Sequence, residues 1–177
     1  MNYFEFYNLP ESFFPDEKQL KAKFYEYSRK YHPDFHATAS PEKQREILEL
    51  STLNTNAYKT LSNPESRMAY LLKSHGLLEE GTKNELPADF LMEMMDLNER
   101  LMELEFDFEA EAMRSLQAEF DSVWAALETE IAPLLQQFES LPATEKENAL
   151  QAVKIYYLKR KYLLRIKETL ATFAHRS

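Results

Sequence analysis

The chain has 177 residues, which suits one domain or two small ones, and 44% of them are hydrophobic, enough for a packed core. It contains two glycines and no cysteine, so the composition favours helices and excludes disulfides, thiolate nucleophiles and cysteine-ligated zinc or iron–sulfur sites held by this chain alone. A net charge of −9 argues against nucleic-acid binding, which needs a basic surface. No stretch approaches ~18 apolar residues and no secretory signal opens the sequence, so we expect a cytoplasmic protein without a membrane span.

Two helical patterns open the chain. Residues 2–8 predict one or two helical turns. A longer helix is predicted over residues 16–31, where Asp16 can cap the first turn and Gln19 can reach back to it. Five basic and three acidic side chains give this helix a local charge of +2, on a face that either meets solvent or a partner. Its apolar residues recur at helical spacing on one side: Leu20, Phe24, Tyr27 and Tyr31.

A tripeptide of His32, Pro33 and Asp34 follows this helix. Proline disfavours helical geometry at the residue before it and cannot donate to the helical ladder. The helix should therefore end in a loop that displays an imidazole beside a carboxylate. On these residues alone, the tripeptide is either an ordinary turn or a surface that another protein recognises.

The rest of the first unit is predicted to be helical as well. After a loop over residues 35–40, serine–proline and asparagine–proline pairs start two further helices, over 41–61 and 64–75. Gly76 is a plausible helix stop. Residues 1–75 thus predict two main antiparallel helices, with the tripeptide at one end and two short helices around them.

Residues 76–86 lack periodicity and predict a linker to a second unit over residues 87–177. Short connections between long helical patterns predict an antiparallel three-helix bundle there, so the whole chain is expected to be all-α. Pro133 should kink or break the middle helix, and Thr144 with Glu147 forms a capping box at the start of the last. The three helices are predicted over residues 87–107, 109–140 and 144–174.

The first helix of this bundle has two apolar faces. One is a stripe at helical spacing that predicts a core face: Phe90, Met94, Leu97, Leu101, Leu104 and Phe108. A second stripe lies roughly opposite, with acidic residues beside it: Leu91, Met92, Met95, Met102 and Phe106, with Asp96, Glu99 and Glu103. Residues 87–113 contain nine acidic side chains and one arginine. The second stripe could bind a partner, pack within this chain or form a homodimer.

The last helix is basic, and we expect its charge to complement the acidic first helix of the bundle. Its tyrosines, Tyr157 and Tyr162, could face either the core or a partner. The basic residues of this helix are Lys154, Lys159, Arg160, Lys161, Arg165 and Lys167.

Enzymatic and metal chemistry finds little support in the sequence. His32, Asp34 and His36 lie close together, but their spacing matches no closed metal site, and His75 and His175 lie elsewhere. There is no glycine-rich phosphate loop, nucleophile elbow or zinc-protease motif. We expect no enzyme, cofactor or metal site; a small metal-dependent protein using these three residues is the alternative.

The first 75 residues resemble a J-domain, the module of DnaJ-type co-chaperones. The residues that match are Tyr31, His32, Pro33 and Asp34, followed by Ala57, Tyr58, Leu61, Asn63, Pro64, Arg67 and Tyr70. The rest resembles the HscB family, J-type co-chaperones of iron–sulfur cluster assembly. That match includes Met1 to Phe4, Tyr70 to Leu72 with His75 and Gly76, and Phe90 to Glu93.

The resemblance implies two protein-binding surfaces and no catalysis by this chain. The J-domain would bind an ATP-bound HscA- or DnaK-type chaperone and stimulate its ATPase, through His32, Pro33, Asp34, Lys21, Arg29 and Lys30. The bundle would bind the iron–sulfur scaffold protein IscU and deliver it, through Leu91, Met92, Met95, Asp96, Glu99 and Tyr157. A J-protein with a different client is the alternative.

The sequence departs from the family pattern in four places. Phe35 follows the tripeptide where most J-domains have lysine, and Asn54-Thr55 stands where an apolar-Asn pair is common. Met95 and Tyr157 replace the leucine and phenylalanine often seen at those positions.

Overall fold

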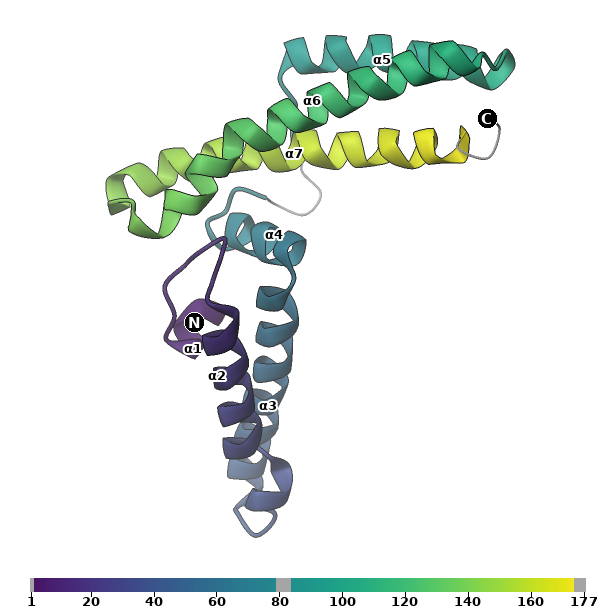
Figure 1. Ribbon diagram of the computed structural model, residues 1–177. Helices are drawn as coiled ribbons and strands as arrows, with labels where there is room; N and C mark the ends of the chain where they lie inside the picture. The colour runs from purple at the N-terminus through teal and green to yellow at the C-terminus, as the bar shows by residue number, and fades with distance from the viewer. Residues whose placement is uncertain (1, 79–83, 174–177) are drawn as a thin grey trace. The chain divides into compact units, whose positions relative to one another are not determined.

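The computed structural model describes residues 2–78 and 84–173, and its regular structure there is entirely helical (Figure 1). The chain divides into two compact units, Met1–Gly76 with Phe138–Ser140, and Leu77–Gln137 with Leu141–Ser177. The all-α prediction is therefore confirmed for the described residues. Part of the predicted linker, residues 79–83, lies outside them, as do His175 and the last predicted helical residue, 174.

The first unit is built on a helical hairpin. Helices α2 (Glu17–Lys30) and α3 (Pro41–Ser62) run side by side, and the short 3-10 helix η1 (Pro33–His36) lies at the end where they join (Figure 1). The predicted loop over 35–40 is wrong in part, because residues 35 and 36 belong to η1. Proline at the first position of η1 has a backbone angle that suits a helical turn. The elements are α1 (Tyr3–Tyr7), α2 (Glu17–Lys30), η1 (Pro33–His36), α3 (Pro41–Ser62) and α4 (Pro64–Ser74).

Side-chain caps begin the main helices at the predicted residues. Asp16 accepts hydrogen bonds from the backbone amides of Lys18 and Gln19, at 2.8 and 3.1 Å, and these bonds lower the pKa of its carboxyl. The Gln19 side chain reaches back to the Asp16 carboxylate rather than to backbone. Ser40 and Asn63 cap α3 and α4 in the same way. Gly76 follows α4 with a φ of +68°, the left-handed geometry expected at a helix stop.

A buried hydrogen-bond network holds α1, α2 and α3 together. The Tyr7 hydroxyl donates to Oδ1 and to the backbone oxygen of Asn54, at 2.8 and 2.9 Å. The Asn54 amide donates in turn to the backbone oxygen of Phe24 and to Oγ of Ser28, at 3.1 and 3.0 Å. Asn54 is only 2% exposed, so its amide is satisfied entirely within the protein.

The second unit is a bundle of three helices, α5 (Ala88–Phe106), α6 (Ala110–Gln137) and α7 (Ala143–Phe173). The 3-10 turn η2 (Phe138–Ser140), which follows α6 in the chain, is grouped with the first unit. Helix α6 continues through Pro133, so it is not broken there, and the alternative of a kink stays a prediction. Proline there removes one hydrogen bond to the carbonyl of Thr129, which is exposed and can bind water instead. Helix α7 begins at Ala143, so Thr144 lies inside the helix and does not start it.

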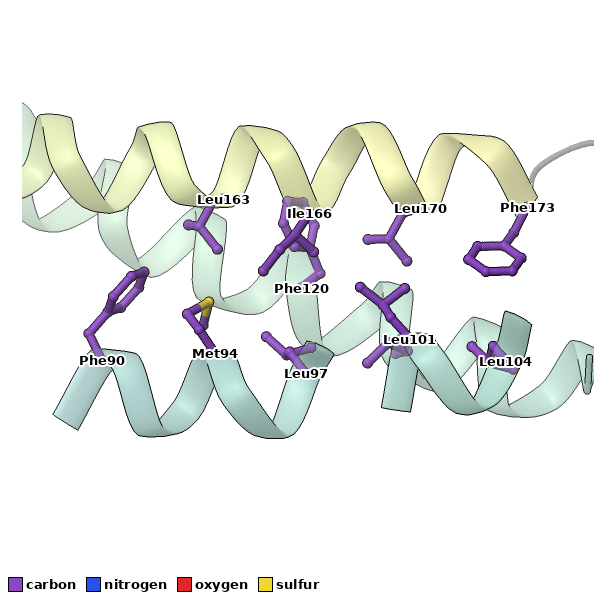
Figure 2. Close-up of a cluster of buried hydrophobic side chains, with 11 residues drawn as sticks. Phe90, Met94, Leu97, Leu101, Leu104, Phe120, Leu163, Ile166, Leu170 and Phe173 are labelled. Atoms are coloured by element: carbon purple, nitrogen blue, oxygen red, sulfur yellow. The ribbon is translucent and has the colours of Figure 1, made fainter. Parts of the chain in front are cut away.

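The core of this bundle lies where the first apolar stripe of α5 meets α6 and α7. Five of the six predicted side chains are buried, and Phe108 packs against them while half-buried. Figure 2 shows this stripe pointing toward α7, so the predicted core face is confirmed. The buried cluster contains Phe90, Met94, Leu97, Leu101, Leu104, Leu116, Phe120, Leu163, Ile166, Leu170 and Phe173.

Candidate functional site

The His-Pro-Asp tripeptide forms the tip of the hairpin. His32 caps η1, because its Nδ1 accepts a hydrogen bond from the backbone amide of Asp34 over 3.3 Å. The Asp34 carboxylate lies 3.8 Å from the same nitrogen and is almost fully exposed. When Nδ1 accepts this bond, the ring carries its proton on Nε2, so the tripeptide presents a hydrogen-bond donor beside a carboxylate.

Two side chains fix this loop to the helices on either side of it. Nε2 of His36 lies 2.9 Å from the backbone oxygen of Lys30, at the end of α2. Nε2 of Gln44, on α3, donates to the backbone oxygens of Ala37 and Ala39, at 2.9 and 3.0 Å. The loop is thus held from both directions, which preorganises the tripeptide for a partner. Gln44 was not predicted as part of any site, and His36 was predicted only as a member of the alternative metal site.

Phe35 adds an apolar side chain to this polar loop. Its ring is 73% exposed and lies 5.6 Å, centroid to centroid, from the His32 ring. Aromatic side chains are common anchors in protein interfaces. A surface depression of about 470 Å³ lies beside the loop and is lined by Pro33, His36, Ala37, Pro41, Gln44, Arg45, Ile47 and Leu48.

The basic face of α2 leads up to the tripeptide. Lys21 and Arg29 are exposed and form no ion pair within residues 2–78 and 84–173. Lys30 is also exposed, with its ammonium 5.3 Å from the centre of the Tyr31 ring. Lys23 differs, because it pairs with Glu26 over 3.2 Å. All three predicted chaperone-binding cations are therefore available on the surface that ends at the tripeptide.

The second apolar stripe of α5 is exposed. Met92 and Met95 are 72% and 68% exposed, Leu91 is exposed to a lesser degree, and the carboxylates of Asp96 and Glu99 lie beside them. These five residues share one helix face and form a contiguous acidic-apolar surface. The stripe is not central in its own bundle, since its core-facing counterpart fills that place.

Arg100, the single basic residue of α5, is turned toward α6. It pairs with Glu119 of that helix and more weakly with Asp96, at 3.5 Å. The hydrogen bond to Glu119 raises the pKa of the Arg100 guanidinium above its usual value. The negative charge of the exposed α5 face is therefore left largely uncompensated.

The two tyrosines of α7 have different surroundings. Tyr162 packs against the core, and its hydroxyl accepts a hydrogen bond from Nδ2 of Asn98 over 2.8 Å. Tyr157 is half-buried, with the Lys161 ammonium 5.7 Å from its ring centre. Of the predicted scaffold-binding residues, the structure brings together the five on α5; the membership of Tyr157 stays a prediction.

The basic residues of α7 interact with α6 as well as with α5. Arg160 pairs with Glu128 of α6 over 3.6 Å, and Lys167 lies 5.2 Å from the centre of the Trp124 ring. Lys159 lies over the ring of Phe90 on α5, at 5.3 Å.

The tripeptide loop contains His32, Asp34 and His36, the three residues of the alternative metal site. Within residues 2–78 and 84–173, no three histidine or carboxylate side chains are grouped so as to hold a metal ion. Nor does any helix in that part of the chain have the length and apolar character needed to cross a membrane.

Known families match both units. The DnaJ domain family matches residues 2–70, and the family described as the HSCB C-terminal oligomerisation domain matches residues 86–171. The hairpin with its His-Pro-Asp loop therefore defines the class of this chain, a J-domain co-chaperone. The second match identifies the family more narrowly.

Whole-chain relatives agree with this assignment. The co-chaperone protein HscB homolog of Aliivibrio salmonicida is 33% identical over 156 residues, which are 87% of this chain and 90% of that protein. The human iron-sulfur cluster co-chaperone protein HscB is 37% identical over 133 residues, 72% of this chain and 57% of that protein. The crystal structure of human HscB matches with a TM-score of 0.62 and 29% identity, covering 97% of this chain and 81% of that one. The chain belongs to the HscB family, and the predicted resemblance is confirmed.

Proposed function

We propose that this chain is a cytoplasmic adaptor of iron–sulfur cluster assembly that delivers an IscU-type scaffold protein to an HscA- or DnaK-type chaperone and stimulates the ATPase of that chaperone. Membership of the HscB family supports this role, since a human relative is named as an iron–sulfur cluster co-chaperone. The chain would act by binding alone and would take no part in the bond-breaking chemistry. A J-protein with another client is the alternative.

The tripeptide loop is the observation that carries the proposal. Its donor and carboxylate are exposed at the end of a basic helix and held in place by His36 and Gln44. Lys21, Arg29 and Lys30 would form charge-assisted contacts with an acidic chaperone surface. Asp34 would bind better to the chaperone state that hydrolyses ATP, and such differential binding shifts the equilibrium toward that state.

The α5 face would bind the scaffold. Leu91, Met92 and Met95 would bury their side chains against an apolar surface, and methionine side chains adapt well to an irregular partner. Asp96 and Glu99 would set the orientation of the partner through its basic residues. Tyr157 is included in this surface as a prediction.

Single-turnover ATP hydrolysis by the chaperone tests the J-domain role. The His32→Gln chain should lose most of its stimulation, because glutamine cannot reproduce the imidazole that caps η1. The same substitution at His75, which pairs with Glu11 over 2.9 Å at the far end of α4, should leave stimulation in place. A His32→Gln chain as active as wild type would overturn the proposed mechanism.

Titration calorimetry with the apo form of an IscU-type scaffold tests whether the scaffold is the client of this chain. The wild-type chain should bind, and Met92→Ala should weaken binding. Absence of binding by the wild-type chain would favour a J-protein with another client.

A further inference from the structure

The exposed apolar face of α5 extends beyond the predicted scaffold-binding residues. Met102 is 60% exposed, and Phe106, the last residue of α5, is 88% exposed. No large hydrophobic side chain in the described part of the chain is more exposed than Phe106. Side chains of this size are seldom left in water without a binding role when they are contiguous with other apolar groups.

Spacing places these two residues on the same face as the predicted site. Met92, Met95, Glu99, Met102 and Phe106 follow one another at steps of three, four, three and four residues, so they line one side of the helix. At a rise of ~1.5 Å per residue, the line from Met92 to Phe106 is about 21 Å long. The predicted residues thus cover only the first half of a continuous surface.

The charges beside this second half indicate the kind of partner. Glu99, Glu103 and Glu105 are exposed and form no ion pair within the described residues, while Arg100 is directed to Glu119. A second copy that applied the same face symmetrically would bring these carboxylates together, which opposes a homodimer. A partner segment with basic side chains beside its apolar ones fits instead.

We propose that Met102 and Phe106 extend the scaffold-binding face and bind an apolar segment of the scaffold protein that is flanked by lysine or arginine. This inference rests on the proposed function and enlarges its interface to the full length of α5. Phe106 at the helix end is the anchor, since its ring can be covered from several sides by a partner. Glu103 and Glu105 select the basic flanks of that segment.

Titration of the full-length chain with the apo form of an IscU-type scaffold tests this inference. The Met102→Ala/Phe106→Ala variant should bind at least ~10-fold more weakly than wild type. Phe14→Ala, which removes another exposed ring from the first unit, should bind as wild type does. The double variant should still stimulate chaperone ATPase in the absence of scaffold, because the tripeptide is unchanged.

Three outcomes would overturn the inference. Wild-type affinity of the double variant, with weaker binding by Met92→Ala, would confine the interface to the first half of α5 and leave the proposed function intact. A doubled sedimentation mass of the wild-type chain that the double variant loses would show that a second copy covers this face. A wild-type chain that does not bind the scaffold would overturn the inference and the proposed client together.

Discussion

His36 bonds through Nε2 to the backbone oxygen of Lys30, so the second residue after the tripeptide is joined to the basic helix before it. A carbonyl oxygen can only accept, so His36 is the donor and carries a proton on Nε2. This bond links the two parts of the proposed chaperone surface, the tripeptide and the cations of α2. Their relative position is therefore fixed before any partner binds.

Replacement of His36 by alanine should weaken chaperone stimulation without unfolding the chain. One exposed hydrogen bond contributes about 1 kcal/mol, so we expect roughly a fivefold rise in the concentration that gives half-maximal ATPase stimulation. Thr38→Ala, in the same loop, is the matched control. Equal effects of the two substitutions would show that the bond to Lys30 does not position the tripeptide.

Removal of charge from α2 should make stimulation less sensitive to salt. Lys21→Gln/Arg29→Gln eliminates two exposed cations that have no partner in the described residues, and should reduce stimulation severalfold at low ionic strength. The difference from wild type should shrink toward 1 M salt, where the screening length falls to ~3 Å. Lys59→Gln, an exposed lysine of α3, controls for charge alone. A deficit that is unchanged by salt would contradict an electrostatic role.

The helical architecture was predictable because caps, prolines and periodicity are local signals. The tertiary roles of single residues were not. A helical wheel places Asn54 on the core side of α3, but its polar side chain is satisfied there by Tyr7 and Ser28, which are 47 and 26 residues away in sequence. The 3-10 turn was missed because it depends on the cap formed by the His32 side chain.

The candidate site shows the same limit. The sequence identified two apolar stripes on α5 but could not show whether the second one is buried or exposed. A helical wheel does not show which stripe contacts the neighbouring helices. Packing against α7 decides that Phe90 is buried and Met92 is exposed. Tertiary structure also brings Gln44 to the tripeptide loop, and no local motif marks that residue.

Replacement of Tyr7 by phenylalanine should destabilise the first unit. It leaves the buried Oδ1 of Asn54 without its donor, which costs about 1–3 kcal/mol. Burial raises the pKa of the Tyr7 hydroxyl, so above about pH 10 the unfolded chain releases this proton while the folded chain keeps it. Tyr7 therefore loses its stabilising contribution as the pH rises past 10, and the phenylalanine variant has no such loss from this position.

Urea unfolding followed by circular dichroism at pH 7 and pH 10.5 measures both effects. The gap in stability between wild type and Tyr7→Phe should be wide at pH 7 and narrower at pH 10.5. Trp124, the only tryptophan, lies in α6, so its fluorescence transition reports the second unit and should be unchanged by the substitution. A gap that stays constant with pH would contradict a neutral, buried Tyr7 hydroxyl.

Leu101 and Met102 are neighbours in sequence on different faces of α5, one buried in the bundle core and the other exposed. Leu101→Ala should create a cavity and cost about 2–5 kcal/mol, with a lower unfolding midpoint by Trp124 fluorescence. Met102→Ala should change stability by less than about 0.5 kcal/mol, because it removes only exposed surface.

The effects of these two substitutions on scaffold affinity should be the reverse of their effects on stability. At a temperature where both are folded, Leu101→Ala should bind the scaffold nearly as wild type does, whereas Met102→Ala should bind more weakly. A stable Met102→Ala chain with wild-type affinity would remove that residue from the interface. A large loss of stability in Met102→Ala would instead mean that the second stripe is buried in solution, and that α5 contacts another surface before the scaffold binds.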